Sequence, residues 1–171
     1  MSVRFVIDSL DFVRNAGVRR DKIPVFELTR LHDLLYDHAG EVTYQISGYL
    51  DDNSKPILCL EIAGMIHLCC QRCLDKLVQN IDLQTFLLLV ENEAELDQNN
   101  EDDTMDAILA VPDLDVWGLI EEEIILSLSI SSRHPDGMCK MHKLISNEKD
   151  SIEASHLSHP FEVLATFKKI K

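Results

Sequence analysis

Residues 41–90 have the sequence EVTYQISGYLDDNSKPILCLEIAGMIHLCCQRCLDKLVQNIDLQTFLLLV. Apolar side chains recur at alternate positions along three stretches of this segment, 41–50, 56–68 and 77–90. A period of two is typical of half-buried antiparallel strands. The turn residues Asp-Asp-Asn-Ser separate the first stretch from the second, and a cluster of cysteines separates the second from the third. The segment therefore predicts three strands in meander order.

The segments around this meander predict helices and less regular structure. Residues 1–40 are mixed, with a candidate helix over 9–16, a strand-like stretch over 23–26 and helical spacing of leucines over 28–36. Residues 113–130 predict a helix that Asp113 or Asp115 can cap. An irregular segment and a C-terminal helix follow in 131–171. We expect one α+β domain over 1–171: an antiparallel sheet whose meander could close like a barrel, a few flanking helices and a long acidic loop.

The acidic loop is predicted from the distribution of charge. The 171 residues include 30 Asp and Glu against 16 Lys and Arg, a formal net charge of −14. Residues 91–123 hold 13 of these acids and no Lys or Arg, whereas both ends of the chain are mildly basic. Residues 91–106 show no periodicity, so we expect 91–112 to be a mobile acidic loop. This charge disfavours RNA at one face only and favours a basic partner.

Hydropathy and cysteine usage indicate the compartment. No run of 18 apolar residues is present, so we expect no membrane partner. The first residues lack the features of a signal peptide, and we expect a cytoplasmic protein. The five cysteines are an odd number, and three of them crowd into Cys69, Cys70 and Cys73. In such a chain they indicate thiols or metal ligands rather than a disulfide framework.

The pair Cys70 and Cys73 has the C-x2-C spacing of a zinc knuckle. Tetrahedral zinc needs two more ligands, and His134 and Cys139 are the best suppliers in this sequence. The four residues are therefore a candidate Cys3His zinc set. The alternative is that all four have buried or polar structural roles without a metal. A dithiol redox site is disfavoured, because a strand rather than a helix is predicted after the pair.

No complete catalytic set can be identified. The sequence contains no G-x-S-x-G, H-E-x-x-H or P-loop pattern, so we expect neither an enzyme nor a small-molecule substrate. The consecutive acids Glu121, Glu122 and Glu123 point in different directions on a helix, and their simplest interpretation is a solvated face. They are also candidate partner-binding residues. Pro160 and Phe161, in the segment HPFEVLA, could bind a partner or dock on the core.

The order of four short motifs resembles the YceD family of large ribosomal RNA subunit accumulation proteins. The motifs are CQRC at 70–73, EEEIILSL at 121–128, the H-x4-C pair at 134–139 and HPFEVLA at 159–165. The resemblance runs from about residue 41 to the end. Prolines are common in the family where this chain has Ser129 and Ser132, and Asn is common where it has His159. The matching positions are Cys70, Cys73, Glu122, His134, Cys139, Pro160 and Phe161.

The resemblance implies ribosome biogenesis, with no enzymatic activity established for the family. We expect a non-enzymatic factor that promotes synthesis, processing or accumulation of large-subunit (23S) ribosomal RNA by holding a basic ribosomal protein or a processing factor. The alternative is direct binding of large-subunit RNA through the basic ends of the chain. The basic residues that would contact the RNA are Arg14, Arg19, Arg20, Lys22, Lys168, Lys169 and Lys171. A cysteine-dependent enzyme ranks last.

Overall fold

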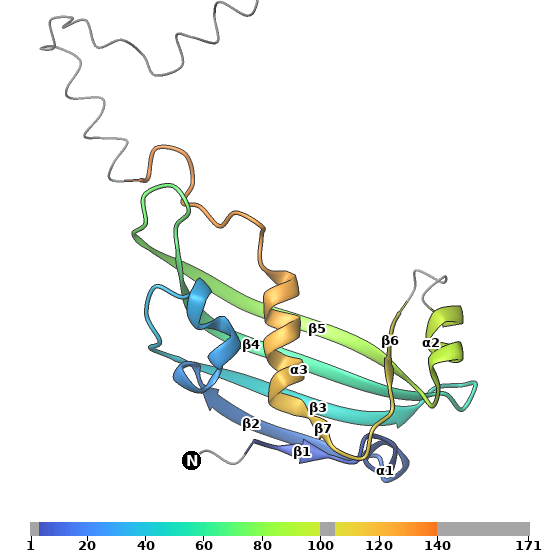
Figure 1. The fold of residues 1–171 in the computed structure, drawn as a ribbon. Coiled ribbons are helices and arrows are strands. Elements are labelled where there is room, and N and C mark those ends of the chain that lie inside the picture. Colours follow the sequence, from blue (N-terminus) through green and yellow to red (C-terminus); the bar gives the residue numbers. More distant parts are fainter. Residues whose placement is uncertain (1–3, 100–104, 140–171) are drawn as a thin grey trace, which may run out of the picture. The chain divides into compact units, whose positions relative to one another are not determined.

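The computed structural model describes residues 4–99 and 105–139. The chain divides into two compact units, Met1–His134 and Pro135–Lys171. All the helices and strands named below belong to the first unit (Figure 1). In the second, the N–H of Met138 donates to the carbonyl of Pro135 at 3.1 Å, which closes a turn. The predicted C-terminal helix, with Pro160 and Phe161, lies outside the described residues.

The main sheet has five strands in the order β2-β3-β4-β5-β6. The predicted meander is its centre and is confirmed almost to the residue. Neighbours from β2 to β5 are antiparallel, and β6 is parallel to β5. Because β2 and β6 stand at opposite ends of this order, the sheet is open, and the expected closure into a barrel is wrong. The strands are β2 (Val18–Pro24), β3 (Glu41–Leu50), β4 (Pro56–Cys69), β5 (Lys76–Val90) and β6 (Asp106–Leu109).

The strand register explains the alternation in the sequence. Tyr44 of β3 lies opposite Ile62 of β4, which lies opposite Leu83 of β5, so the three side chains share one face. Burial of that face is the main stabilising contribution, at roughly 1.5–3 kcal/mol for each large apolar side chain. Four short helices supply the other half of the core, and Figure 1 shows α3 lying across the strands. They are α1 (Ser9–Arg14), two 3-10 helices η1 (Val25–Glu27) and η2 (Thr29–Leu34), and α3 (Val116–Ser127).

Helix α3 begins where the sequence predicts a cap. The Asp115 carboxylate accepts hydrogen bonds from the backbone N–H groups of Trp117 at 3.1 Å and Gly118 at 3.2 Å. These are two of the donors that a helix leaves without intrahelical partners at its N-terminus. Asp115 also ends β7 (Leu114–Asp115), which pairs with β1 (Val6–Ile7) in a separate two-stranded sheet. The cap therefore ties the start of α3 to the N-terminal strand.

The predicted acidic loop is wrong in part, because it contains a helix and a strand. Helix α2 (Glu93–Asn99) begins after Asn92, whose side-chain oxygen accepts from Glu95 N at 2.9 Å. The Glu95 carboxylate accepts in return from Glu91 N at 3.3 Å, so the two side chains stabilise the first turn from both sides. Leu96 then packs against a small cluster of buried side chains on β4 and β5. This packing and capping give α2 a fixed place beside β6.

Two predictions in the N-terminal third are also corrected. The helix expected over 28–36 forms only as the shorter 3-10 helix η2. The strand expected over 23–26 starts earlier, as β2, because Val18–Pro24 pairs with residues 41–47 of β3. Among the residues that the structure describes, no helix has the length and apolar character that crossing a bilayer would require.

Candidate metal centre

The turn between β4 and β5 carries the two cysteines of the C-x2-C motif. The last ladder pair, Cys69 with Lys76, leaves six residues to reverse the chain. The N–H of Cys70 donates to the carbonyl of Asp75 at 3.0 Å, and the N–H of Leu74 donates back to the carbonyl of Cys70 at 2.9 Å. Leu74 adopts φ +58°, a left-handed conformation that tightens the turn. These bonds direct the thiols of Cys70 and Cys73 inward, where both are buried.

The segment after α3 brings His134 to this turn. The N–H of Gln71 donates to the carbonyl of Ser132 at 2.9 Å, and the Arg72 guanidinium donates to the carbonyl of His134 at 3.2 Å. The imidazole Nδ1 of His134 lies 3.4 Å from Cys73 Sγ, although the two residues are 61 positions apart in the chain. The backbone is therefore bonded to the turn both two residues before His134 and at His134 itself.

A hydrogen bond at the other ring nitrogen of His134 fixes the orientation and tautomer of the imidazole. Nε2 lies 3.0 Å from the carbonyl of Lys76. A carbonyl only accepts, so Nε2 carries the proton and Nδ1 turns its lone pair towards the thiol of Cys73. Metal-binding histidines are usually oriented in this way, by a hydrogen bond from the nitrogen that does not bind the metal.

Cys139 completes a group of four possible ligands. One ligand atom from each of Cys70, Cys73, His134 and Cys139 lies within 4.8 Å of the other three. The thiols of Cys70 and Cys139 are 0% and 1% exposed. Three buried thiols and one imidazole are the donor set of a common type of structural zinc site. The structure thus brings together the four residues selected from the sequence, in a group that could hold a metal ion.

The surroundings of Cys70 favour the thiolate, which is the form that binds metals. Burial would raise the pKa of this thiol, but hydrogen bonds to the sulfur from the backbone of His134, Arg72 and Cys73 outweigh burial and lower the pKa to about 5. The N–H of His134 makes its bond at 3.5 Å. Cys69 does not belong to the group of four, and its thiol donates instead to the carbonyl of Leu74 at 3.6 Å.

A second polar cluster next to the turn was not predicted. The imidazole of His67 lies 2.6 Å from the Asp37 carboxylate, and the Lys76 ammonium lies 3.1 Å from the other Asp37 oxygen. The hydrogen bond with His67, followed by that with Lys76, lowers the pKa of Asp37 to about 2 despite some desolvation. The three residues come from three separate segments, so no local motif in the sequence could have identified them. They hold the loop before β3 against the β4–β5 hairpin.

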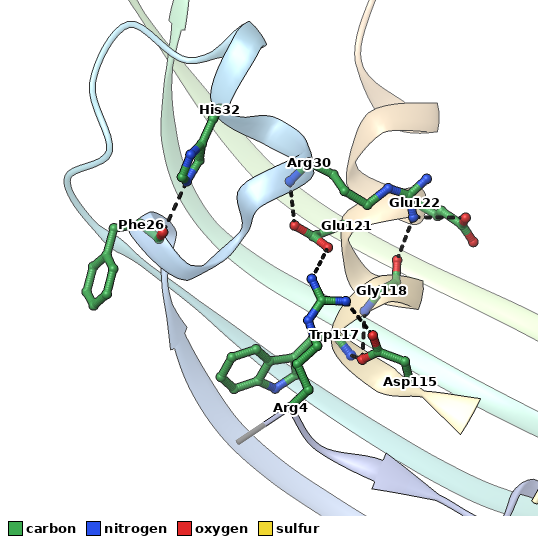
Figure 2. A network of polar contacts seen from close by, with 9 residues as sticks. All are labelled: Arg4, Phe26, Arg30, His32, Asp115, Trp117, Gly118, Glu121 and Glu122. Carbon is green, nitrogen blue, oxygen red and sulfur yellow. Dashed lines mark hydrogen bonds and ion pairs between the residues drawn. The ribbon is translucent and has the colours of Figure 1, made fainter. Parts of the chain in front are cut away.

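The acids Glu121, Glu122 and Glu123 each contact a different part of the fold. Glu121 is 1% exposed, and its Oε1 accepts from the N–H of Arg30 at 2.8 Å (Figure 2). Glu122 forms an ion pair with the Arg30 side chain at 2.9 Å, and Glu123 accepts from the Thr85 hydroxyl at 2.8 Å. The expected solvated face is therefore wrong for Glu121, because the helix turns this residue towards η2. Partner binding by these three residues stays a prediction.

Comparison with known proteins identifies a family model that matches the chain. The family model described as large ribosomal RNA subunit accumulation protein YceD matches residues 58–168. This range covers more than half of the chain and includes all four possible metal ligands. No curated protein and no solved structure gives a significant match.

Proposed function

Because the chain belongs to the YceD family of large ribosomal RNA subunit accumulation proteins, we propose that it is a non-enzymatic ribosome biogenesis factor. It promotes the synthesis, processing or accumulation of large-subunit (23S) ribosomal RNA. It does so indirectly, by holding a basic ribosomal protein or a basic processing factor while the subunit is assembled.

The observation that carries this mechanism is the acidic stretch from 91 to 123, with 13 acids and no Lys or Arg. The nine acids whose side chains the structure describes fall into two sets. Asp115, Glu121, Glu122 and Glu123 make the contacts within the fold described above. A second set is exposed on α2 and in the turn before it, at the start of β6 and in the turn after β6, and we call it the acidic surface. It consists of Glu91, Glu93, Glu95, Asp106 and Asp113.

The acidic surface suits a partner rich in lysine and arginine. Exposed charges of one sign raise the rate of encounter with an oppositely charged protein and screen its charge once it is bound. The surface is held on packed elements, because Leu96 of α2 and Ala107 and Leu109 of β6 share one apolar cluster. A partner therefore meets a preorganised array of carboxylates and has less ordering entropy to overcome than it would on a mobile loop.

We further propose that the Cys3His group binds one zinc ion with a structural role. Zinc bound by Cys70, Cys73, His134 and Cys139 would fasten the β4–β5 turn to the segment that follows α3. Four protein ligands leave no open coordination position for water or substrate, which fits a non-enzymatic factor. The imidazole oriented by the carbonyl of Lys76 and the lowered pKa of Cys70 support this assignment.

A pull-down with purified ribosomal proteins tests the acidic surface. The variant replaces its five acids by the matching amides, and Gln at position 95 keeps the side-chain acceptor that begins α2. The control variant neutralises five acids outside the acidic surface, at Asp11, Asp33, Asp52, Glu61 and Asp82, and so has the same net charge.

Capture of basic ribosomal proteins should survive nuclease treatment, fall steeply between low and high salt, and be lost only in the acidic-surface variant. Equal loss in both variants would show that net charge alone attracts the partner, and would refute a specific surface. Loss of capture after nuclease treatment of the unaltered chain would show that RNA bridges the two proteins, and would refute the proposed mechanism.

A further inference from the structure

A cavity of about 630 Å³ lies between the N-terminal residues, the edge strand β2 and the first turn of α3. This volume is within the roughly 300–1,000 Å³ usual for sites that bind small molecules. The cavity walls combine cationic and aromatic side chains with one acid. Arg4 and Arg19 are the cations, Phe5, Tyr44 and Trp117 are the aromatic groups, and Asp21 is the acid. Lys22 also lines the cavity, but it lies opposite Thr43, so its side chain is on the other face of the sheet.

The strand register explains how these groups meet. Arg19 lies opposite Ile46, and Asp21 lies opposite Tyr44, so Arg19 and Tyr44 both face α3 and the N-terminal residues. Trp117 enters from the first turn of α3, next to the cap that Asp115 provides. Arg4 reaches the same cap, where its guanidinium lies 2.5 Å from Asp115 (Figure 2). The cavity is therefore built from four segments that the core holds in place.

The cations of the cavity remain accessible to an anion. The side chains of Arg4 and Arg19 are 45% and 47% exposed. Each has a partner within the fold: Arg4 lies 2.5 Å from Asp115, and Arg19 lies 3.1 Å from Asp21. Exposed ion pairs of this kind are weak and exchange readily. A guanidinium also has five N–H donors, more than one carboxylate can occupy.

The aromatic groups offer surfaces on which a planar ring can stack. The guanidinium carbon of Arg19 lies 4.4 Å from the centre of the Phe5 ring, so a planar cation is already stacked at this wall. Phe5 and Trp117 are only partly buried and keep ring surface at the cavity. Single-stranded nucleic acid is recognised by this combination, with bases stacked on aromatic rings or guanidinium planes and phosphates bound by cations.

We propose that this cavity binds a nucleotide of single-stranded RNA. The base stacks on the aromatic wall that includes Trp117, and Arg19 and Arg4 bind the phosphates. The site is separate from the acidic surface, which lies on α2, β6 and the turn after β6. The inference therefore stands without the proposed protein partner, and one chain could hold RNA and a basic protein at different places.

Trp117 is the only tryptophan of the chain, so its fluorescence reports directly on this cavity. The experiment titrates the full chain at low salt with a single-stranded RNA decamer of mixed sequence, and in parallel with adenosine monophosphate. The decamer should quench the fluorescence with a saturable dependence on concentration. The affinity should fall with rising salt.

The matched pair of variants is Arg19→Ala and Arg20→Ala. Both remove one positive charge from β2, but Arg20 lies opposite Gln45 and lines a hollow on the other face of the sheet. Arg19→Ala should weaken RNA binding about tenfold, the size of one charge-assisted contact, and reduce the slope of log K against log salt by about 0.7. Arg20→Ala should change the affinity less than twofold.

Three results would overturn the proposal. Absence of quenching and of RNA binding at low salt would exclude the site. Equal weakening by the two variants, with circular dichroism showing both folded, would mean non-specific attraction to a basic strand. Mononucleotide binding as tight as that of the decamer would assign the cavity to a free nucleotide instead of an RNA strand. Binding to the Trp117→Phe variant is followed by the anisotropy of labelled RNA. Phenylalanine keeps an aromatic surface for stacking, so this measurement checks that the quenching seen with Trp117 reports binding.

Discussion

Replacing Glu121 by alanine should remove about 2–4 kcal/mol from the free energy of unfolding. The larger part is the hydrogen bond from Arg30 N at 2.8 Å, because a bond to a buried carboxyl group contributes about 1.5–3 kcal/mol. The contact of Arg4 with the second carboxyl oxygen, at 3.7 Å, adds less than about 1 kcal/mol since that arginine is half exposed. The loss is a large part of the roughly 5–15 kcal/mol typical of a folded domain.

Urea unfolding followed by Trp117 fluorescence measures the effect. With a slope of about 2 kcal/mol per molar urea, the midpoint should fall by about 1–2 M while the slope stays unchanged. The midpoint of Glu121→Gln should lie between those of the unaltered chain and Glu121→Ala, because the amide oxygen can still accept from Arg30 N. No hydrogen bond from the described residues reaches Oε2 of Glu121, so the amide change leaves the existing bond in place.

Glu122→Ala is the matched control. It removes the neighbouring acid of the same helix, whose ion pair with the Arg30 side chain is about half exposed at both ends. Its effect should stay below about 1 kcal/mol. If the two alanine variants agree within about 0.5 kcal/mol, Glu121 does not hold η2 on α3, and the assignment of these acids to different roles fails.

Three other predictions concern the metal centre, the Asp37 cluster and the contact of α1 with the sheet. The purified chain should contain one equivalent of zinc by elemental analysis; Cys70→Ser should lose it, whereas Cys69→Ser should keep it, and a metal-free chain purified without chelator would contradict the site. Because the pKa of Asp37 falls from 3.8 to about 2 on folding, its stabilising contribution is complete above pH 3.8 and is lost as the pH falls towards 2; unfolding of Asp37→Asn should depend less steeply on pH in that window, and an unchanged slope would contradict the cluster. Gly48→Ala would place a Cβ 2.8 Å from Val13 Cα, so calorimetry should show a loss of about 1–3 kcal/mol, against little change for Ser47→Ala on the other face.

The strands of the meander could be predicted because each carries its own signal. The period of two in 41–50, 56–68 and 77–90 reflects one buried face, and turn residues mark the ends. The four possible metal ligands could be selected for a similar reason, since C-x2-C and H-x4-C are local spacings. That the two halves meet depends on the chain after α3 returning to the β4–β5 turn, and no local pattern specifies this.

Other features could not be predicted because their cause lies elsewhere in the chain. Strand β2 contains Arg19, Arg20, Asp21 and Lys22, and at the edge of the sheet it has no alternation to detect. Glu121 is buried because Arg30, 91 residues earlier, offers its N–H there. Helix α2 did have a local signal, the Asn92-x-x-Glu95 cap, which the strong acidity of the segment concealed.

The pairing of β1 with β7 also fixes an order of events during synthesis. Val6 pairs with Asp115, so the first strand has no partner until 109 further residues have been made. At about 5–20 residues per second, it waits roughly 5–20 s. The cavity shared by Arg4, Phe5 and Trp117 cannot exist before that moment. A nascent or truncated chain that ends before α3 therefore has its basic N-terminus but not the cavity, and the proposed RNA site can form only after translation has passed Trp117.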